Sequence, residues 1–156
     1  LANFDGLKVG LVWAGSPKHK NDHTRSIRLS AFARLAQVPG VRLFGLQRGP
    51  QAAELASAPF PITNLEEEDT DILDTAAIML HLNLVIAVDT MAAHLAGALA
   101  RPTWTLLAHV PDFRWLLGRE DSPWYPTMRL FRQPRPGDWP AVIERVTQEL
   151  GNAARH

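Results

Sequence analysis

The sequence contains no cysteine among its 156 residues. Disulfide bonds, cysteine-ligated zinc sites and thiol nucleophiles are therefore excluded together. The absence of cysteine also fits a reducing compartment, in which disulfides rarely form. We expect the protein to be cytoplasmic.

An excess of charge of either sign is also missing, since 16 Lys and Arg balance 16 Asp and Glu. Nucleic-acid binders usually carry a basic excess, so we expect no nucleic-acid partner. No apolar run approaches the roughly 20 residues of a membrane-spanning helix, and no signal segment opens the chain. The sequence begins with Leu1 rather than Met, which favours a fragment of a larger protein.

What the chain does contain is enough apolar sequence for one packed domain. Its length matches a common domain size, and hydrophobic residues make up 46% of it. Short apolar runs predict strands over residues 9–14, 41–46, 61–65, 84–88, 102–107 and 128–131. Capping residues and helical spacing predict one helix from Ser30 to Pro39 and others over 50–56, 72–82, 89–99 and 138–150, with an irregular stretch over 108–126.

The alternation of strands and helices predicts an α/β fold, with a mostly parallel sheet covered by helices on both faces. In such sheets, ligands bind in the crevice outside the carboxyl ends of the strands. The unusual residues of this chain gather in the connections that follow Ala14, Val88 and Leu107. Because each of these residues ends a predicted strand, we expect the three connections to meet at one rim of the sheet.

The strongest candidate site begins with Asp89, directly after the apolar strand 84–88. Asp89 is expected at a helix start, and Thr90 and His94 lie four residues apart on one face of that helix. A helix amino terminus together with a hydroxyl and an imidazole suits a pyrophosphate, because the terminus already favours negative charge. The alternative is that Asp89 only caps the helix and His94 is a half-buried structural histidine.

The second candidate is the polar segment 16–26, which concentrates Lys18, Lys20 and Arg25 in a charge-neutral protein. These cations follow the first strand, so they are expected on the same rim, where they would neutralise a diphosphate. The alternative is a solvated surface loop, which most charged runs are. His19, Asp22 and His23 make weak metal ligands without a defined further partner, and we expect no metal site.

A long aromatic and basic segment over residues 108–126 is the third candidate, since loops of more than about 12 residues in compact domains are usually functional or disordered. Its candidate residues are Arg114, Trp115, Arg119 and Trp124. They would form a lid or a docking surface, or the tryptophans would simply pack the segment onto its own domain.

The pair Asp74 and Thr75 stands near the start of the predicted helix 72–82. These residues would contact the base or ribose of a nucleotide, or would cap that helix. The pattern favours the cap. The acidic run over residues 66–69 is expected to be solvated.

With these residues in view, the chain resembles the carboxyl-terminal domain of glycosyltransferase family 9, the heptosyltransferase-like enzymes. It looks most like the branch fused behind tetratricopeptide repeats in bacterial proteins. The stretches that carry the resemblance are VGLVWAGSPKHKNDHTRSIRL, VIAVDTMAAHLAGALARPTW and DFRWLLGREDSPWYPTMRLFRQ.

The resemblance implies a GT-B architecture, in which two Rossmann-like domains face each other across a cleft. Residues 1–156 would form one Rossmann-like domain that binds the nucleotide-diphosphate sugar, and an upstream domain would hold the acceptor. The implied reaction is inverting glycosyl transfer without a metal or other cofactor. No catalytic residue is assigned in this chain, because the family's candidate base, an acidic residue, lies in the other domain. We therefore expect the chain to be inactive alone.

Carried over to this sequence, the family's donor contacts fall on Asp89, Thr90 and His94, which would contact the sugar and the diphosphate. Met91 departs from the family, which usually has glycine after the Asp-Thr or Asp-Ser pair. A side chain at Met91 would change how closely the backbone approaches the sugar. The donor therefore need not be ADP-heptose.

The same comparison makes Lys18 or Lys20 the phosphate-neutralising lysine, with Arg25 and Ser26 as supporting contacts. The alternative function is a non-catalytic nucleotide-binding or protein-interaction module attached to a tetratricopeptide-repeat scaffold. Flanking sequence would discriminate between the two, since an upstream Rossmann-like half favours the enzyme.

Overall fold

The computed structural model describes residues 6–14, 27–47, 50–64, 72–88, 90–107 and 127–154. These residues form one six-stranded sheet in the order β3-β2-β1-β4-β5-β6, and all five neighbouring pairs are parallel. The strands are β1 Leu7–Val12, β2 Val41–Gly45, β3 Thr63–Asn64, β4 Leu84–Val88, β5 Thr103–Leu107 and β6 Met128–Arg132. The expected parallel sheet with helices is confirmed.

Apolar sequence accounts for the position of β4 at the centre of the sheet. All five residues of β4 are buried, because the strand pairs with β1 on one side and with β5 on the other. A strand buried on both faces carries a continuous apolar run rather than an alternating one. The run LVIAV meets this requirement, and its predicted bounds match the structure.

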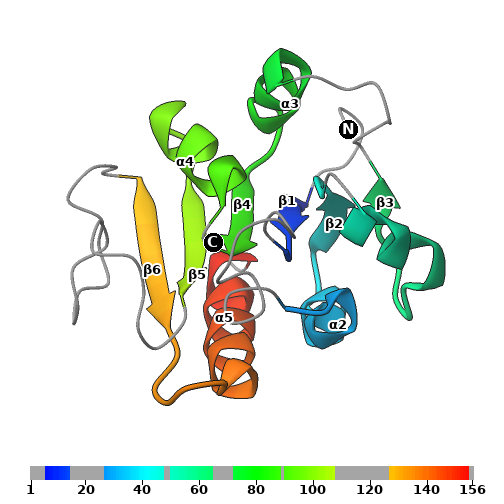
Figure 1. Cartoon of the computed structure of the whole chain (residues 1–156), viewed down its shortest axis with the longest axis vertical. Helices are drawn as coiled ribbons and strands as arrows, with labels where there is room; N and C mark the ends of the chain where they lie inside the picture. The colour runs from blue at the N-terminus through cyan, green and yellow to red at the C-terminus, as the bar shows by residue number, and fades with distance from the viewer. Residues whose placement is uncertain are drawn as a thin grey trace.

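The helices cover both faces of the sheet, as Figure 1 shows, with α3 and α4 above it and α2 and α5 below it. The upper layer consists of α3 Ile72–Met79 and α4 Met91–Ala98. The lower layer consists of the 3₁₀ helix η1 Leu29–Phe32, the short α2 Ala33–Ala36 and the long α5 Trp139–Ala154. Two separate apolar clusters fill the spaces between these layers and the sheet.

Several predicted helix bounds are wrong in detail. The helix expected from Ser30 is a 3₁₀ turn followed by one turn of α-helix, and the residue before it, Arg28, makes no side-chain cap. Residues 50–56 form part of a 3₁₀ helix, η2 Pro50–Ser57, rather than an α-helix. Helix α3 ends at Met79 because its last turn tightens, with the N–H of His81 bonded to the carbonyl oxygen of Ile78.

Helix α5 runs four residues beyond the predicted end at Leu150. Gly151 does not end the helix, because Ala154 in the following turn packs against the lower apolar cluster. Burial of Val142, Val146 and Leu150 on one side of α5 confirms the amphipathic pattern of this segment.

The strand order reverses between β1 and β4: β2 and β3 are added on one side of β1, and β4, β5 and β6 on the other side. After β1 the chain passes through the lower layer to β2, whereas after β4 it passes through α4 in the upper layer to β5. Helices that leave adjacent strands toward opposite faces open a crevice at the carboxyl ends of those strands. The topological switch point of this fold therefore lies at the carboxyl ends of β1 and β4.

Candidate functional site

The carboxyl ends of β1 and β4 lie side by side in the sheet, where Val12 pairs with Ala87. The segments that follow these two strands carry the first two sites expected from the sequence. The shared rim assumed in the sequence argument is thus present for β1 and β4.

Helix α4 begins at this rim, and its N-cap is Thr90. The Thr90 backbone is extended, with φ −142° and ψ 171°, and its side-chain Oγ1 accepts a hydrogen bond from the backbone N–H of Ala93 at 3.4 Å. This corrects the expectation that the helix starts at Asp89. Both residue types cap helices well, so local preference does not separate them, and the geometry of the strand end selects Thr90.

His94 lies one turn into α4. Its backbone N–H bonds to the carbonyl oxygen of Thr90 at 3.3 Å, which confirms that the two residues share a turn. The residue is half-buried, and its Nε2 atom is shielded from solvent. The buried alanines Ala93 and Ala96 let the helix lie close to β4 and β5, so the amino terminus of α4 is held at the rim.

The end of β1 is held by a buried amide, the side chain of Gln47. Its Oε1 accepts hydrogen bonds from the backbone N–H groups of Trp13 and Ala14, each at 2.9 Å. Its Nε2 donates to the carbonyl oxygen of Ala14, also at 2.9 Å. Gln47 is 4% exposed, so water does not compete for these bonds. The sheet is thereby extended two residues past β1 by a side chain.

A carboxylate from η2 joins the same network. Glu54 Oε2 accepts from the indole Nε1 of Trp13 at 3.0 Å, and Oε1 accepts from the backbone N–H of Leu29 at 3.2 Å. The backbone N–H of Ile27 bonds to the Trp13 carbonyl oxygen at 2.7 Å. Ile27, after the segment 15–26, therefore lies beside Trp13, just before that segment.

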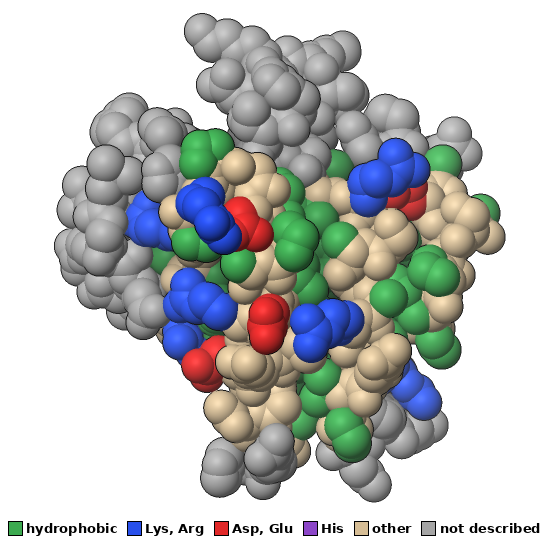
Figure 2. Space-filling view, turned by 90° about the horizontal axis from the view of Figure 1, so that it is seen from below, with side chains coloured by type: hydrophobic (Ala, Val, Ile, Leu, Met, Phe, Trp, Pro, Cys, Tyr) green, Lys and Arg blue, Asp and Glu red, His purple; other side chains and the backbone are tan. Residues whose placement is uncertain are grey.

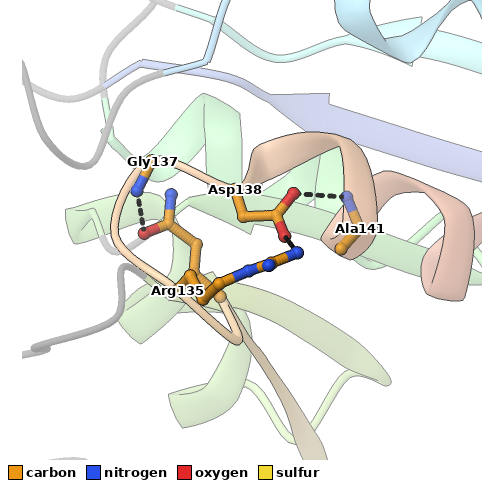
Figure 3. Close-up of polar contacts among 5 residues, drawn as sticks. Arg135, Gly137, Asp138 and Ala141 are labelled. Atoms are coloured by element: carbon orange, nitrogen blue, oxygen red, sulfur yellow. Dashed lines mark hydrogen bonds and ion pairs between the residues drawn. The ribbon is translucent and has the colours of Figure 1, made fainter.

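A second buried amide lies at the edge of the sheet, after β6. Gln133 Oε1 accepts from the backbone N–H of Gly137 at 3.1 Å and closes the turn into α5. Figure 3 shows this turn, in which Asp138 accepts from the N–H of Ala141 and pairs with Arg135 at 3.3 Å. Asp138 thus caps α5 at its first turn.

Among the described residues on the side of the molecule shown in Figure 2, Lys and Arg side chains lie among Asp and Glu side chains. Arg132, at the end of β6, is half-buried, and burial lowers the pKa of its guanidinium below the ordinary value.

Within the described ranges, no group of three or more His, Asp or Glu residues is arranged to hold a metal ion. No described helix is long and apolar enough to cross a membrane.

The two residues expected near the base or ribose are both on α3. Asp74 is exposed in the first turn of the helix, and Thr75 is buried with 4% of its surface exposed. Because α3 begins at Ile72, neither residue occupies the cap position that the sequence favoured. Their contact with a nucleotide stays a prediction.

The remaining candidates lie outside the described residues. They are Lys18, Lys20, Arg25, Ser26, Asp89, Arg114, Trp115, Arg119 and Trp124. Their roles stay predictions.

Sequence reasoning missed Gln47 and Glu54. Gln47 comes two residues after the last residue of β2, so its position at the rim was available from the pattern. Its partners are 33 and 34 residues away in the chain, and the partners of Glu54 are 41 and 25 residues away. Patterns of neighbouring residues in the sequence do not predict contacts over such separations.

Comparisons with known proteins agree with this fold. No family model matches the chain. It is 30% identical over 155 residues to protein FlbA of Caulobacter vibrioides, and the match covers 96% of this chain and 26% of that protein. The chain thus spans about a quarter of the length of that relative.

Two solved structures share the fold. E. coli heptosyltransferase WaaC with ADP-2-deoxy-2-fluoro heptose matches with a TM-score of 0.68 at 18% identity, over 99% of this chain and 46% of that one. A glycosyl transferase family 9 structure from Veillonella parvula matches with a TM-score of 0.62 at 15% identity, over 97% and 39%. The chain therefore has the fold of about half of a heptosyltransferase.

Proposed function

We propose that this chain is the donor-binding half of a glycosyltransferase of family 9, and that it binds a nucleoside diphosphate sugar at the rim formed by β1 and β4. The observation that carries the proposal is the start of α4. A capped helix terminus with Thr90 and His94 in its first turns stands at the reversal point of the sheet, where α/β proteins bind ligands.

The roles follow from the charge of the ligand. Asp89, Thr90 and His94 contact the sugar and the diphosphate, while Lys18 or Lys20 neutralises phosphate oxygens. Arg25 and Ser26 support these contacts. The helix terminus and the cations act on the same negative charge, so neither a metal nor another cofactor is needed.

The reaction is an inverting displacement at the anomeric carbon. A hydroxyl oxygen of the acceptor forms a bond to that carbon while the bond to the diphosphate oxygen breaks, and the hydroxyl proton passes to a base. Negative charge grows on the leaving diphosphate, where fixed donors and cations stabilise it most. The base and the acceptor belong to an upstream half, and tetratricopeptide repeats are the further partner in this proposal.

Binding is the first test. We expect one of ADP, GDP, UDP or CDP to bind the chain in calorimetry, with the same affinity in EDTA as in magnesium. Strict dependence on magnesium would overturn the metal-free part of the proposal. If none of the four nucleotides binds, the non-catalytic interaction module becomes the better account.

Turnover is the second test. We expect no product from the chain alone with a panel of nucleotide sugars, because positioning of the acceptor contributes about 7–11 kcal/mol and a general base about 10²–10⁴-fold. A longer protein with the upstream region should be active, and His94→Ala should abolish that activity. Robust transfer by the 156 residues alone would show that the catalytic groups lie in this chain.

A further inference from the structure

We infer that Gln47 and Glu54 are positioning residues of the proposed donor site, which hold the end of β1 for diphosphate binding without touching the ligand. The inference rests on the proposed function. Its physical basis is the network around Trp13, which ties the end of β1 to β2, to η2 and to the start of η1.

The first step concerns the entry into the rim. Beyond Val12, the chain is directed by Gln47, whose amide both accepts from and donates to the backbone of Trp13 and Ala14. Because this amide is 4% exposed, losing it leaves three backbone groups without their present partner in a dry environment. The direction of the chain at Ala14 thus depends on one side chain.

The second step concerns the return of the chain. Two donors meet the two oxygens of Glu54, one from Trp13 before the segment 15–26 and one from Leu29 after it. A carboxylate fits this arrangement because both of its oxygens accept, whereas a glutamine presents one acceptor and one donor. Glu54 therefore fixes the distance between the two anchors of the segment that carries Lys18, Lys20 and Arg25.

The third step separates positioning from folding. Gln133 makes the same kind of buried side-chain bond, but to the turn between β6 and α5 at the sheet edge. A loss at Gln133 should therefore weaken the fold without moving the end of β1. Ordering binding groups before the ligand arrives lowers the entropic cost of binding, so a loss at Gln47 should weaken binding as well.

The decisive experiment compares Gln47→Met with Gln133→Met, since methionine keeps the approximate volume and removes the amide. Calorimetry with ADP, or with whichever of GDP, UDP and CDP binds the parent chain, gives the Kd, and thermal unfolding gives the Tm. We expect Kd to rise about tenfold for Gln47→Met and to stay within about twofold for Gln133→Met, with both Tm values lowered.

Glu54→Gln supplies the conservative variant, with Glu149→Gln as its control on α5. We expect Glu54→Gln to weaken binding by less than Glu54→Ala, because one acceptor remains, and Glu149→Gln to leave Kd unchanged. Equal Kd values for Glu54→Ala and the parent chain would contradict the role of Glu54.

Failure of the inference differs from failure of the proposed function. A parent chain that binds none of the nucleotides overturns both. A parent chain that binds, with the same Kd in Gln47→Met and Gln133→Met, overturns the inference alone. Trypsin gives a second readout, since cleavage after Lys18, Lys20 and Arg25 should quicken more in Gln47→Met than in Gln133→Met, and equal rates would contradict the inference.

Discussion

The two ends of the parallel sheet are held together in different ways. At the amino end, Asn83 bonds to Lys8 through both its backbone N–H and its side-chain Oδ1, at 2.9 and 2.7 Å. Arg101 reaches across from the start of β5 to the carbonyl oxygen of Leu82 at 2.6 Å. The first two bonds join the turn before β4 to β1, and the third joins the turn before β5 to the turn before β4.

At the carboxyl end of β1, the buried Gln47 and the half-buried Glu54 hold the chain from a distance along the sequence. Gln47 bonds the backbone of Trp13 and Ala14 before residues 15–26, and Glu54 bonds Trp13 before that segment and Leu29 after it. Under the proposed function, the amino end stabilises the sheet, whereas Gln47 and Glu54 at the end of β1 position groups for a ligand. Substitutions at the two ends should therefore affect different measurements.

The largest expected effect is on binding. Lys18→Ala, Lys20→Ala and Arg25→Ala should each weaken diphosphate binding by about 1.5–3 kcal/mol where the side chain makes a direct charged hydrogen bond. Salt dependence of binding should fall in the same variants, because fewer charges meet the phosphates. Thermal stability should barely change, since solvated charges contribute little to folding. Calorimetry at two salt concentrations measures the first effects, and a variant that binds normally but has a clearly lowered Tm would contradict the prediction.

The opposite pattern is expected at the amino end. Arg101→Met removes the guanidinium that donates to the backbone carbonyl oxygen of Leu82, a residue that is 1% exposed. This loss should lower the free energy of unfolding by about 1–3 kcal/mol. Kd for the nucleotide should stay within about twofold, because the change lies at the far end of the strands. Arg34→Met is the matched control on the exposed side of α2 and should cost no more than about 0.5 kcal/mol. Weaker nucleotide binding in Arg101→Met would break the division between the two ends.

The parts of the fold and of the candidate site that could be predicted are those determined by residues close together in the sequence. The buried strand β4 and the amphipathic α5 follow from apolar spacing within a few residues, and both were located from sequence. The parallel sheet and its rim follow from the alternation of such elements. The predicted alternation of strands and helices is therefore confirmed.

The misses have a common physical cause. Asp89 and Thr90 cap helices almost equally well, so the choice between them is made by how β4 ends. Residues 50–57 form a 3₁₀ helix whose Leu55 packs against the lower cluster, and the spacing of their residues does not distinguish a 3₁₀ helix from an α-helix. Gln47 and Glu54 act across the sheet, and their partners become neighbours only once the strand order is set.

The smallest expected effect concerns an exposed ion pair between β6 and α5. Glu149 on α5 lies 3.1 Å from the guanidinium of Arg129 on β6, and their side chains are 36% and 34% exposed. The hydrogen bond from Arg129, with attraction to Arg129 and Arg145, lowers the pKa of Glu149 below its ordinary value. Solvent screens a pair this exposed, so its contribution should not exceed about 1 kcal/mol.

The sign of its pH dependence follows from that lowered pKa. A carboxyl group that is more acidic in the folded chain stabilises the fold at pH values above its unfolded pKa, about 4.3 for glutamate. This contribution is lost as the pH falls through the lower folded value. Urea unfolding should therefore show the parent chain slightly more stable than Glu149→Gln at neutral pH, with the difference shrinking in acid and in high salt. A difference that grew on acidification would mean that Arg129 does not stabilise the ionised carboxylate.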